Sequence, residues 1–452
     1  MLRKLRLILT VITLLVAVGV GAQVTTATMS GKVTAQEEPI IGATIVAIHE
    51  PSGTRYGTVT NVSGQFTLQG MRTGGPYKVE ISYIGYQTAI YKAINLLLGE
   101  NYVLNVSLKE SSELLDEVVV TASKNSNMKS DRAGAVTNLT STKIASIPTV
   151  SRSMNDIMRL SPQSNTTSNG FAAGGGNYRQ SFVTVDGAAF NNSFGIGSNL
   201  PAGGTPISLD ALEQLSVSIT PYDVRQSGFT GASINAVTKS GTNELTGSAY
   251  TFFTNNNMVG DRIGDNSIKL EKSHQYTYGA TLGGAIIKNK LFFFVNGEYE
   301  DDLTAGPIAR ARNDAGEKYG ENGIHRPVAS KMDEIRDYLI NTYDYDPGAY
   351  QGYNVKVPSY KFLARLDWNI NENNKVNVRF SKTNNGYEAS PSTSVNPMTA
   401  SIIFPGDDKK GISSGKGASN DEGLYFRNAR YRQEQRFTSV AGEWNLKWGV
   451  LN

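Results

Sequence analysis

The chemistry of the segment Asp116–Ala122, which reads DEVVVTA, is the clearest in the sequence. It consists of hydrogen bonding by the backbone and not of reactions of side chains. Its three consecutive valines are β-branched and favour an extended chain. A polar stretch, residues 123–132, follows it, and no neighbouring run is placed to close a hairpin. An extended strand of this kind can add to the edge of a partner's sheet. The local sequence also allows a second interpretation, an ordinary edge strand of the domain before it. The candidate docking residues are Asp116, Glu117, Val118, Val119, Val120, Thr121 and Ala122.

Side chains that perform catalysis or bind metals do not form a recognisable pattern. The three histidines, His49, His274 and His325, have no metal-ligand partner three or four residues away, and the chain has no cysteine. His49 is expected at a strand end, at the surface or half-buried. The acidic pair in residues 344–346 lacks the further oxygens that calcium needs, and we expect a solvated turn there. The glycine-rich run in 171–179 lacks the Gly-Lys-Ser/Thr ending of a phosphate loop, and we expect an irregular loop. The sequence predicts no catalytic residue, no metal and no cofactor, and therefore a protein that is not an enzyme.

The composition narrows the class of partner. The net charge is +3 and no basic run follows the first few residues, so nucleic acid is not an expected partner. Glycine accounts for 46 of 452 residues, which suits turns and tightly packed strands better than a helical enzyme.

The first 22 residues have the three parts of a secretory signal peptide. Basic residues come first, then an apolar run from Leu7 to Val20, then small residues at the expected cleavage site between Ala22 and Gln23. The alternative is a transmembrane anchor, but the apolar run falls short of the roughly 20 residues needed to cross a bilayer. We expect export and cleavage, so that the mature chain begins at Gln23.

Residues 23–110 show short strands at even spacing with turn residues between them, which predicts a small β-sandwich. The turn at 60–66 has Asn61 and Gly64 as candidates for left-handed backbone angles, with Phe66 pointing into the core. The runs 31–45, 60–66 and 81–88 resemble the carboxypeptidase-regulatory-like domain. The resemblance implies an accessory folding or interaction module, without peptidase chemistry. The expected strands are 29–34, 44–49, 65–69, 77–83 and 102–108.

Residues 133–241 mix short helices, strands and glycine-rich loops. We expect a helix over 151–160, a strand over 182–185 closed by a turn at Asp186-Gly187, and a helical stretch at 209–215 before a strand at 216–220. The runs 152–162, 184–190 and 209–250 resemble the plug domains of outer-membrane receptors. Residues 220–223 depart from the Arg-Gly-Pro of many receptors and resemble the Oar-like subgroup. The expected plug motif consists of Asp186, Gly187, Gly231, Asn235 and Lys239.

From 242 to 452 the chain alternates apolar and polar residues at a period of two, as outer-membrane barrel strands do. We expect about six strands, with a short turn at 288–290 and a long extracellular loop at 301–358 that contains a helix over 330–343. A soluble sheet with one wet face is the alternative. Six strands cannot enclose a plug, because a barrel that houses one needs roughly 22. We therefore expect an N-terminal fragment of a longer receptor.

The order of these parts resembles a TonB-dependent outer-membrane receptor of the Oar-like subgroup, and Asp116–Ala122 then resembles its TonB box and 111–132 its linker. The expected fold class is mainly β: a sandwich, an α+β plug and the first strands of a large transmembrane barrel, incomplete here. The resemblance implies three partners: a TonB-like periplasmic energy-transducing protein, outer-membrane lipid, and an unknown ligand, for which a surface lipoprotein is one candidate. Energy-coupled uptake of a large ligand is the expected function. The alternative is a structural or adhesion protein of the outer membrane, which would not need DEVVVTA.

Overall fold

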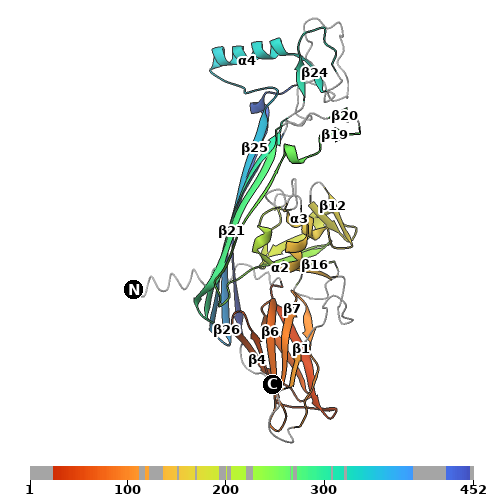
Figure 1. The fold of residues 1–452 in the computed structure, drawn as a ribbon, viewed down its shortest axis with the longest axis vertical. Helices are drawn as coiled ribbons and strands as arrows, with labels where there is room; N and C mark the ends of the chain where they lie inside the picture. The colour runs from red at the N-terminus through yellow and green to blue at the C-terminus, as the bar shows by residue number, and fades with distance from the viewer. Residues whose placement is uncertain are drawn as a thin grey trace, which may run out of the picture.

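The computed structural model shows three parts stacked along one axis (Figure 1). A β-sandwich lies at the bottom, a plug domain lies above it, and a tall curved sheet runs along the left side of the plug in this view. The structure describes residues 24–110, 118–121, 136–149, 152–167, 170–192, 200, 205–219, 226, 228–264, 266–267, 272–306, 309–319, 323–389 and 424–447. The expected fold class is confirmed. The two residues at the expected signal cleavage site, Ala22 and Gln23, lie outside the described residues.

The sandwich consists of two sheets that face each other. The strands of the first are β1 (Ala27–Ala35), β2 (Glu38–Pro39), β5 (Gln65–Met71), β8 (Asn101–Val103) and β9 (Val106–Ser107). The second has the order β10-β7-β6-β3-β4, with β3 (Thr44–His49), β4 (Thr54–Val59), β6 (Gly74–Ser82), β7 (Ala89–Leu96) and β10 (Val118–Thr121). Residues of both sheets, such as Met29, Ile45 and Ile81, are fully buried between them. The sequence did not predict β4 and β7.

Two local expectations in the sandwich need correction. At the turn before Phe66 only Gly64 adopts a left-handed angle, because the Asn61 side chain accepts hydrogen bonds from Ser63 N and Gln65 N and so closes the turn itself. His49 is buried at 5% exposure, with its Nδ1 2.7 Å from Ser52 Oγ.

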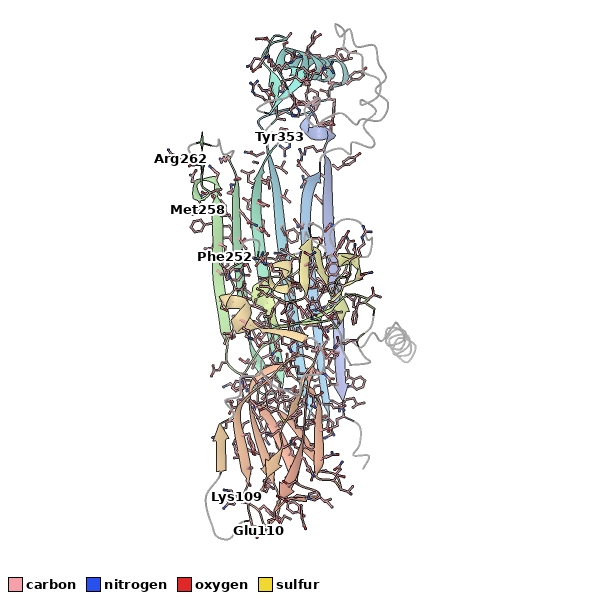
Figure 2. All side chains as sticks on the ribbon, turned by 90° about the vertical axis from the view of Figure 1, so that its right-hand side faces the viewer. Lys109, Glu110, Phe252, Met258, Arg262 and Tyr353 are labelled. Atoms are coloured by element: carbon pink, nitrogen blue, oxygen red, sulfur yellow. The ribbon has the colours of Figure 1, made fainter. Side chains whose placement is uncertain are left out.

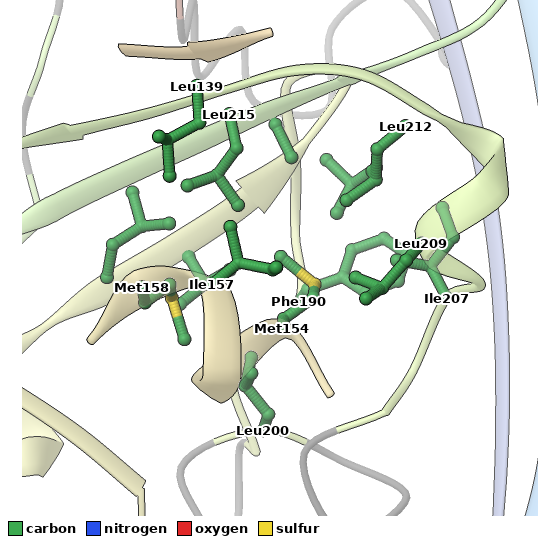
Figure 3. Packing of buried hydrophobic residues seen from close by; sticks show 14 of the residues in the cluster. Leu139, Met154, Ile157, Met158, Phe190, Leu200, Ile207, Leu209, Leu212 and Leu215 are labelled. Atoms are coloured by element: carbon green, nitrogen blue, oxygen red, sulfur yellow. The ribbon is translucent and has the colours of Figure 1, made fainter. Parts of the chain in front are cut away.

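The plug has a five-stranded sheet with the order β11-β16-β17-β14-β15, packed against short helices. Its elements are β11 (Val136–Thr140), α2 (Ser141–Ser146), α3 (Met154–Met158), β12 (Ser164–Thr167), β13 (Gly170–Ala173), η2 (Tyr178–Gln180), β14 (Phe182–Val185), β15 (Ala188–Ala189), η4 (Leu209–Ala211), β16 (Leu212–Ser218) and β17 (Ser233–Thr238). Figure 3 shows the core between them, in which Met154 and Ile157 of α3 meet Leu212 and Leu215 of β16.

Three expectations for the plug are wrong in detail. The helix α3 begins at Met154, because Ser153 and Asp156 form a capping box there, and Leu160 lies outside it and is exposed. The run at 171–179 begins as strand β13, which pairs with β12 and buries Phe171. The helical stretch at 209–215 is one short turn, and the strand β16 already starts at Leu212.

The tall sheet, called the wall below, has six antiparallel strands in chain order. They are β18 (Thr246–Asn255), β21 (His274–Ile287), β22 (Leu291–Ala305), β25 (Asn354–Asn371), β26 (Asn374–Ala389) and β27 (Tyr431–Leu446). The turns at the sandwich end are short, and the connections at the other end are long. Because β22 and β25 extend into 301–358, the long connection there runs from 306 to 353.

The two faces of the wall have opposite character. Leu366, Trp368 and Trp444 belong to the face turned away from the plug and are about half exposed. The opposite face buries charged and polar groups such as Glu298, Lys361 and Arg379. A sheet that exposes apolar side chains and buries charges matches a barrel segment with lipid outside and a polar lumen inside. The sequence predicted both faces correctly.

The long connection above the wall has a small core of its own. Its elements are β23 (Arg310–Arg312), β24 (Ile324–Val328) and α4 (Ala329–Tyr343), and Met332 packs with Ala311 and Tyr350. Ile335 of the same helix is 48% exposed. Asp346 pairs with Arg336, and its turn is solvated as expected. One minor strand pair and two short helical turns complete the described elements: β19 (Arg262–Ile263) with β20 (Asn266–Ser267), and η5 (Asn256–Met258) and η7 (Arg427–Ala429).

None of the helices in the described ranges has the length and apolarity needed to cross a membrane.

We predict that residues 23–110 fold alone in water and that residues 242–452 do not. The sandwich closes its own core, whereas the wall leaves an apolar face and unpaired strand edges exposed. Circular dichroism and size-exclusion chromatography of the two pieces test this. A soluble, monomeric and cooperatively melting 242–452 would contradict the membrane assignment of the wall.

The buried histidine gives the sandwich a pH dependence. Burial, and secondarily the positive charge of Arg72, lower the pKa of His49 to about 3. The unfolded chain takes up a proton near the ordinary pKa of about 6.5 that the folded domain refuses, so stability falls as the pH falls below that value. In urea titrations of residues 23–110, we expect a loss of up to about 1.4 kcal/mol per pH unit between pH 6 and 5. His49→Gln should flatten this slope, and equal slopes in both proteins would refute the assignment.

Candidate functional site

The contact between plug and wall centres on Asp186. Asp186 and Gly187 form the two-residue turn between β14 and β15, with φ angles of 46° and 80°, so the turn projects its carboxylate beyond the sheet. The carboxylate accepts hydrogen bonds from Thr238 N and Oγ1 at 2.8 and 2.7 Å. It also accepts from Arg365 Nη1 at 3.3 Å and Arg379 Nη1 at 2.8 Å. One plug carboxylate therefore joins two strands of the wall.

The charges of this cluster are balanced although it is buried. Burial alone would raise the pKa of Asp186, but Arg365, Arg379 and the bonds from Thr238 outweigh burial and lower it. Arg365 also donates to Asp367 at 2.9 Å and to Thr238 O at 2.9 Å, and Arg379 donates to Val185 O. Asp186 is thus ionised at neutral pH and is held between the two arginines.

A second polar contact lies higher on the wall. Ser208, which caps η4 of the plug, donates to Glu298 Oε2 at 2.8 Å, and Tyr250 of β18 donates to the same oxygen at 2.8 Å. Lys361 Nζ donates to Glu298 Oε1 at 2.6 Å. Ser208, Glu298 and Lys361 are all buried. This contact ties the plug to β22 and β25 through hydrogen bonds around an ion pair.

Beside this contact the plug and the wall line a partly open cavity of about 540 Å³. Arg152 enters it from the plug, pairs with Asp210, and stacks over the ring of Phe252 at 3.9 Å. Figure 2 shows Phe252 level with the plug on the first strand of the wall. Thr277, one strand further, lines the cavity and is 6% exposed. The cavity has charges of both signs, and no group among the described residues has the side chains to hold a metal ion.

The other residues of the expected plug motif support the cluster from within the plug. Asn235 is buried and accepts from Thr184 Oγ1 at 2.7 Å, which ties β17 to β14. A side chain at Gly231 would press against the backbone of Gln180 at 3.3 Å. Gly187 lies 3.4 Å from Thr25 of the sandwich, measured from its ideal Cβ position. Lys239 lines the cavity.

The docking segment lies elsewhere, on the sandwich. Val118–Thr121 forms β10, which pairs in parallel with Ala89–Lys92 of β7. The prediction of an extended strand is confirmed. We expect a backbone that is free to pair with a partner, whereas one edge of this strand is already paired with β7. The second interpretation, an edge strand of the preceding domain, describes this pairing. Asp116, Glu117 and Ala122 lie outside the described residues.

The charged partners of the plug on the wall were not predicted. The period of two puts Arg365 and Arg379 on the polar face of their strands, but it does not single out these two residues, Glu298 or Lys361. A signal was present on β26, where Arg379 stands among the small polar residues Asn377, Ser381 and Thr383. The same face of β22 and β25 also carries Phe294 and Leu363, which obscures it there. Their partners are more than 60 residues away in the chain, so the pattern alone could not pair them.

Comparisons with known proteins agree with this architecture. Residues 28–109 match the carboxypeptidase regulatory-like domain, and residues 237–418 match the outer membrane beta barrel domain. The TonB-dependent transporter Oar of Myxococcus xanthus is 24% identical over 263 residues, which cover 56% of this chain and 23% of that protein. The chain is a homologue of the Oar-type TonB-dependent transporters. It spans about a quarter of the length of this curated relative.

Solved receptors are similar at lower identity. The siderophore receptor PirA of Pseudomonas aeruginosa is 20% identical, with 57% of this chain and 36% of that chain covered and a TM-score of 0.35. The outer membrane transporter YddB of Escherichia coli is 12% identical, with 57% and 34% covered and a TM-score of 0.40. The three similar proteins, Oar, PirA and YddB, are named as transporters or receptors and not as enzymes.

We predict that Asp186→Ala detaches the plug from the wall. The change leaves two buried arginines without their shared carboxylate, a loss of about 3–5 kcal/mol for a broken buried ion pair. Thermal melting of the receptor in detergent, followed by protease sensitivity of the plug, measures it. Asp346→Ala is the matched control, because its pair with Arg336 is exposed and its loss should leave the melting temperature unchanged. Equal effects of both substitutions would contradict the role given to Asp186.

Proposed function

We propose that this chain belongs to an energy-coupled outer-membrane transporter, exported by its signal peptide and with its sandwich in the periplasm. A TonB-type partner docks on Asp116–Ala122 and pulls, and the plug then moves relative to the wall. The short turns at the sandwich end of the wall support this orientation, because the periplasmic turns of such barrels are short.

The character of the contact between plug and wall is the observation that carries the proposal. Its centres are the bonds of Asp186 and Ser208 with charged groups of the wall. Separating an ion pair into a wet lumen lets water solvate both charges, whereas separating an apolar interface exposes surface that water disfavours. Apolar side chains of the wall, Phe294, Leu363 and Phe437, also pack against the plug core. The polar bonds at Asp186 and Ser208 hold the plug in place, and water can replace them when the plug is displaced.

For the ligand we propose a large solute, a peptide, a glycan or a chelate. The long connection 306–353 supports this class, because it builds a folded element above the wall, and such loops carry binding sites. A structural or adhesion role without active transport is the alternative, and it requires no docking segment.

We predict that Val119→Pro weakens partner binding far more than Val119→Ala. Strand addition relies on backbone hydrogen bonds, and proline removes a donor and fixes φ, whereas alanine leaves the backbone intact. Isothermal titration of the intact receptor in detergent with the C-terminal domain of the TonB-type protein tests this. We expect at least a tenfold weaker affinity for proline and less than a threefold change for alanine. Equal tolerance of both would make the segment a mere linker.

Because these 452 residues contain no cysteine, one cysteine introduced among them can report on plug movement. Thr277→Cys places one thiol at a buried position of the cavity between plug and wall. In energised cells an impermeant maleimide should label it several times faster than after collapse of the proton gradient, read by mass spectrometry of the tryptic peptide. Val119→Pro should remove the difference. Labelling that is independent of energy would favour the structural role.

A further inference from the structure

The docking strand is part of the sheet of the sandwich. Strand β10 pairs through all four of its residues with β7 and forms the edge of the sheet β10-β7-β6-β3-β4. No strand among the described residues pairs with its other edge. A partner strand can therefore add to the outer edge of β10 while its inner edge stays on the sandwich. Release of β10 would instead require breaking its bonds to β7 first.

The far end of β7 is bonded to the centre of the plug. The Gln214 side chain of β16 donates from Nε2 to Leu96 O at 2.9 Å and accepts from Leu98 N at 2.8 Å at Oε1. Gln214 is 2% exposed, and Leu98 is 1% exposed. One plug amide thus satisfies two backbone groups just past the ladder that holds β10. Asn138 of β11 adds a bond to Glu100 at 2.7 Å.

The contacts between the sandwich and the wall are of a different kind. Asn243 N donates to Pro51 O at 2.8 Å, Asn369 donates to Thr54 at 2.9 Å, and Lys447 donates to Gly57 O at 2.5 Å. They join strand-end turns, where the groups are exposed or half-buried except for Thr54, which is buried. Arg72 of the sandwich also pairs with Asp367 of the wall at 3.7 Å, and Lys375 of the wall lies over the ring of Tyr56 at 3.8 Å. Exposed polar contacts contribute little to stability because water replaces them readily, whereas buried ones are costly to break. The two bonds of Gln214 are fully buried, and they make the least solvated connection of the sandwich to its neighbours.

We propose that the sandwich is the handle through which the plug is pulled: the partner extends the sheet at β10, and β7 and Gln214 pass the force to β16. The inference rests on the proposed docking of a TonB-type partner at Asp116–Ala122. The alternative route runs along the chain from Thr121 to Val136. A fully extended chain of those intervening residues, about 14, spans roughly 45–50 Å. The bonds through the sandwich are already in place, and they need no extension of that segment to carry force.

The first test locks β10 to β7. Lys92 is exposed and is the register partner of Thr121, so Lys92→Cys with Thr121→Cys gives a disulfide on a surface position. In the oxidised receptor we expect partner binding, and energised labelling of Thr277→Cys, within about twofold of the unlocked receptor. Loss of either on oxidation, with recovery on reduction, would show that the partner needs β10 released from β7. This result would overturn the proposal that the sandwich transmits the force.

The second test locks the sandwich to the wall. An ideal Cβ on Gly53 lies 2.9 Å from Asn289 Cγ, so Gly53→Cys with Asn289→Cys brings two thiols together. Oxidation should leave partner binding unchanged and reduce energised labelling at residue 277 at least tenfold. The two single-cysteine variants carry the same backbone strain without the bond and should label normally. Unchanged labelling in the locked receptor would mean that the force bypasses the sandwich.

A third variant removes the hydrogen bonds between Gln214 of the plug and the backbone of the sandwich. Gln214→Leu should keep partner binding and lose most of the energised labelling, because the plug no longer holds Leu96 and Leu98. Normal labelling would overturn the role of Gln214. Failure of the docking proposal looks different: binding would tolerate Val119→Pro, or the unlocked receptor would show no energised labelling at all.

Discussion

The arrangement of the upper two parts depends on Asp186 and its two arginines. A plug that sealed the lumen with apolar side chains would gain about 25 cal/mol for each Å² buried and would resist removal in proportion. Here the turn of β14 and β15 presents a single carboxylate to Arg365 and Arg379. The interaction is strong while water is excluded and weakens once water enters. The wall in turn keeps these charges on its inner face, beside the buried Phe294 and Leu363, and exposes most of its other apolar side chains on the outer face.

The wall has charged side chains on its inner face and apolar ones on its outer face, and this arrangement explains why the sequence predicted the wall well. With a period of two, Tyr278 and Leu282 fall on one face and Thr277 on the other, and each face meets a uniform solvent. Long strands repeat the pattern many times, so single exceptions do not hide it. The turn at Asp186-Gly187 was predicted for a similar reason, because residues that tolerate left-handed angles at a strand end specify a hairpin locally.

The remaining errors concern structure that is decided at a distance. Strand β7 reads AIYKAINL, whose alanines, lysine and asparagine do not favour a strand, and it is extended because β6 and β10 pair with it. Phe171 lies in a glycine-rich run and is ordered by β12. Gln214 was hidden inside an assumed helical turn, and its two partners belong to another domain. No local pattern contains such information.

At Arg72, where the sandwich meets the other two parts, the bonds within the sandwich are shorter than the contacts with its neighbours. Arg72 is fixed within the sandwich, because its N–H donates to Tyr56 OH at 3.1 Å and its carbonyl accepts from Tyr77 OH at 2.7 Å. Its guanidinium reaches outward, to Asp367 of the wall at 3.7 Å and to Gly241 O at 3.4 Å. Those outer distances are long, and both charged side chains of the pair keep some exposure to solvent. The sandwich thus holds the backbone of Arg72 by short internal bonds, while its guanidinium meets the wall through longer ones, so a separation at this residue would leave the sandwich itself intact.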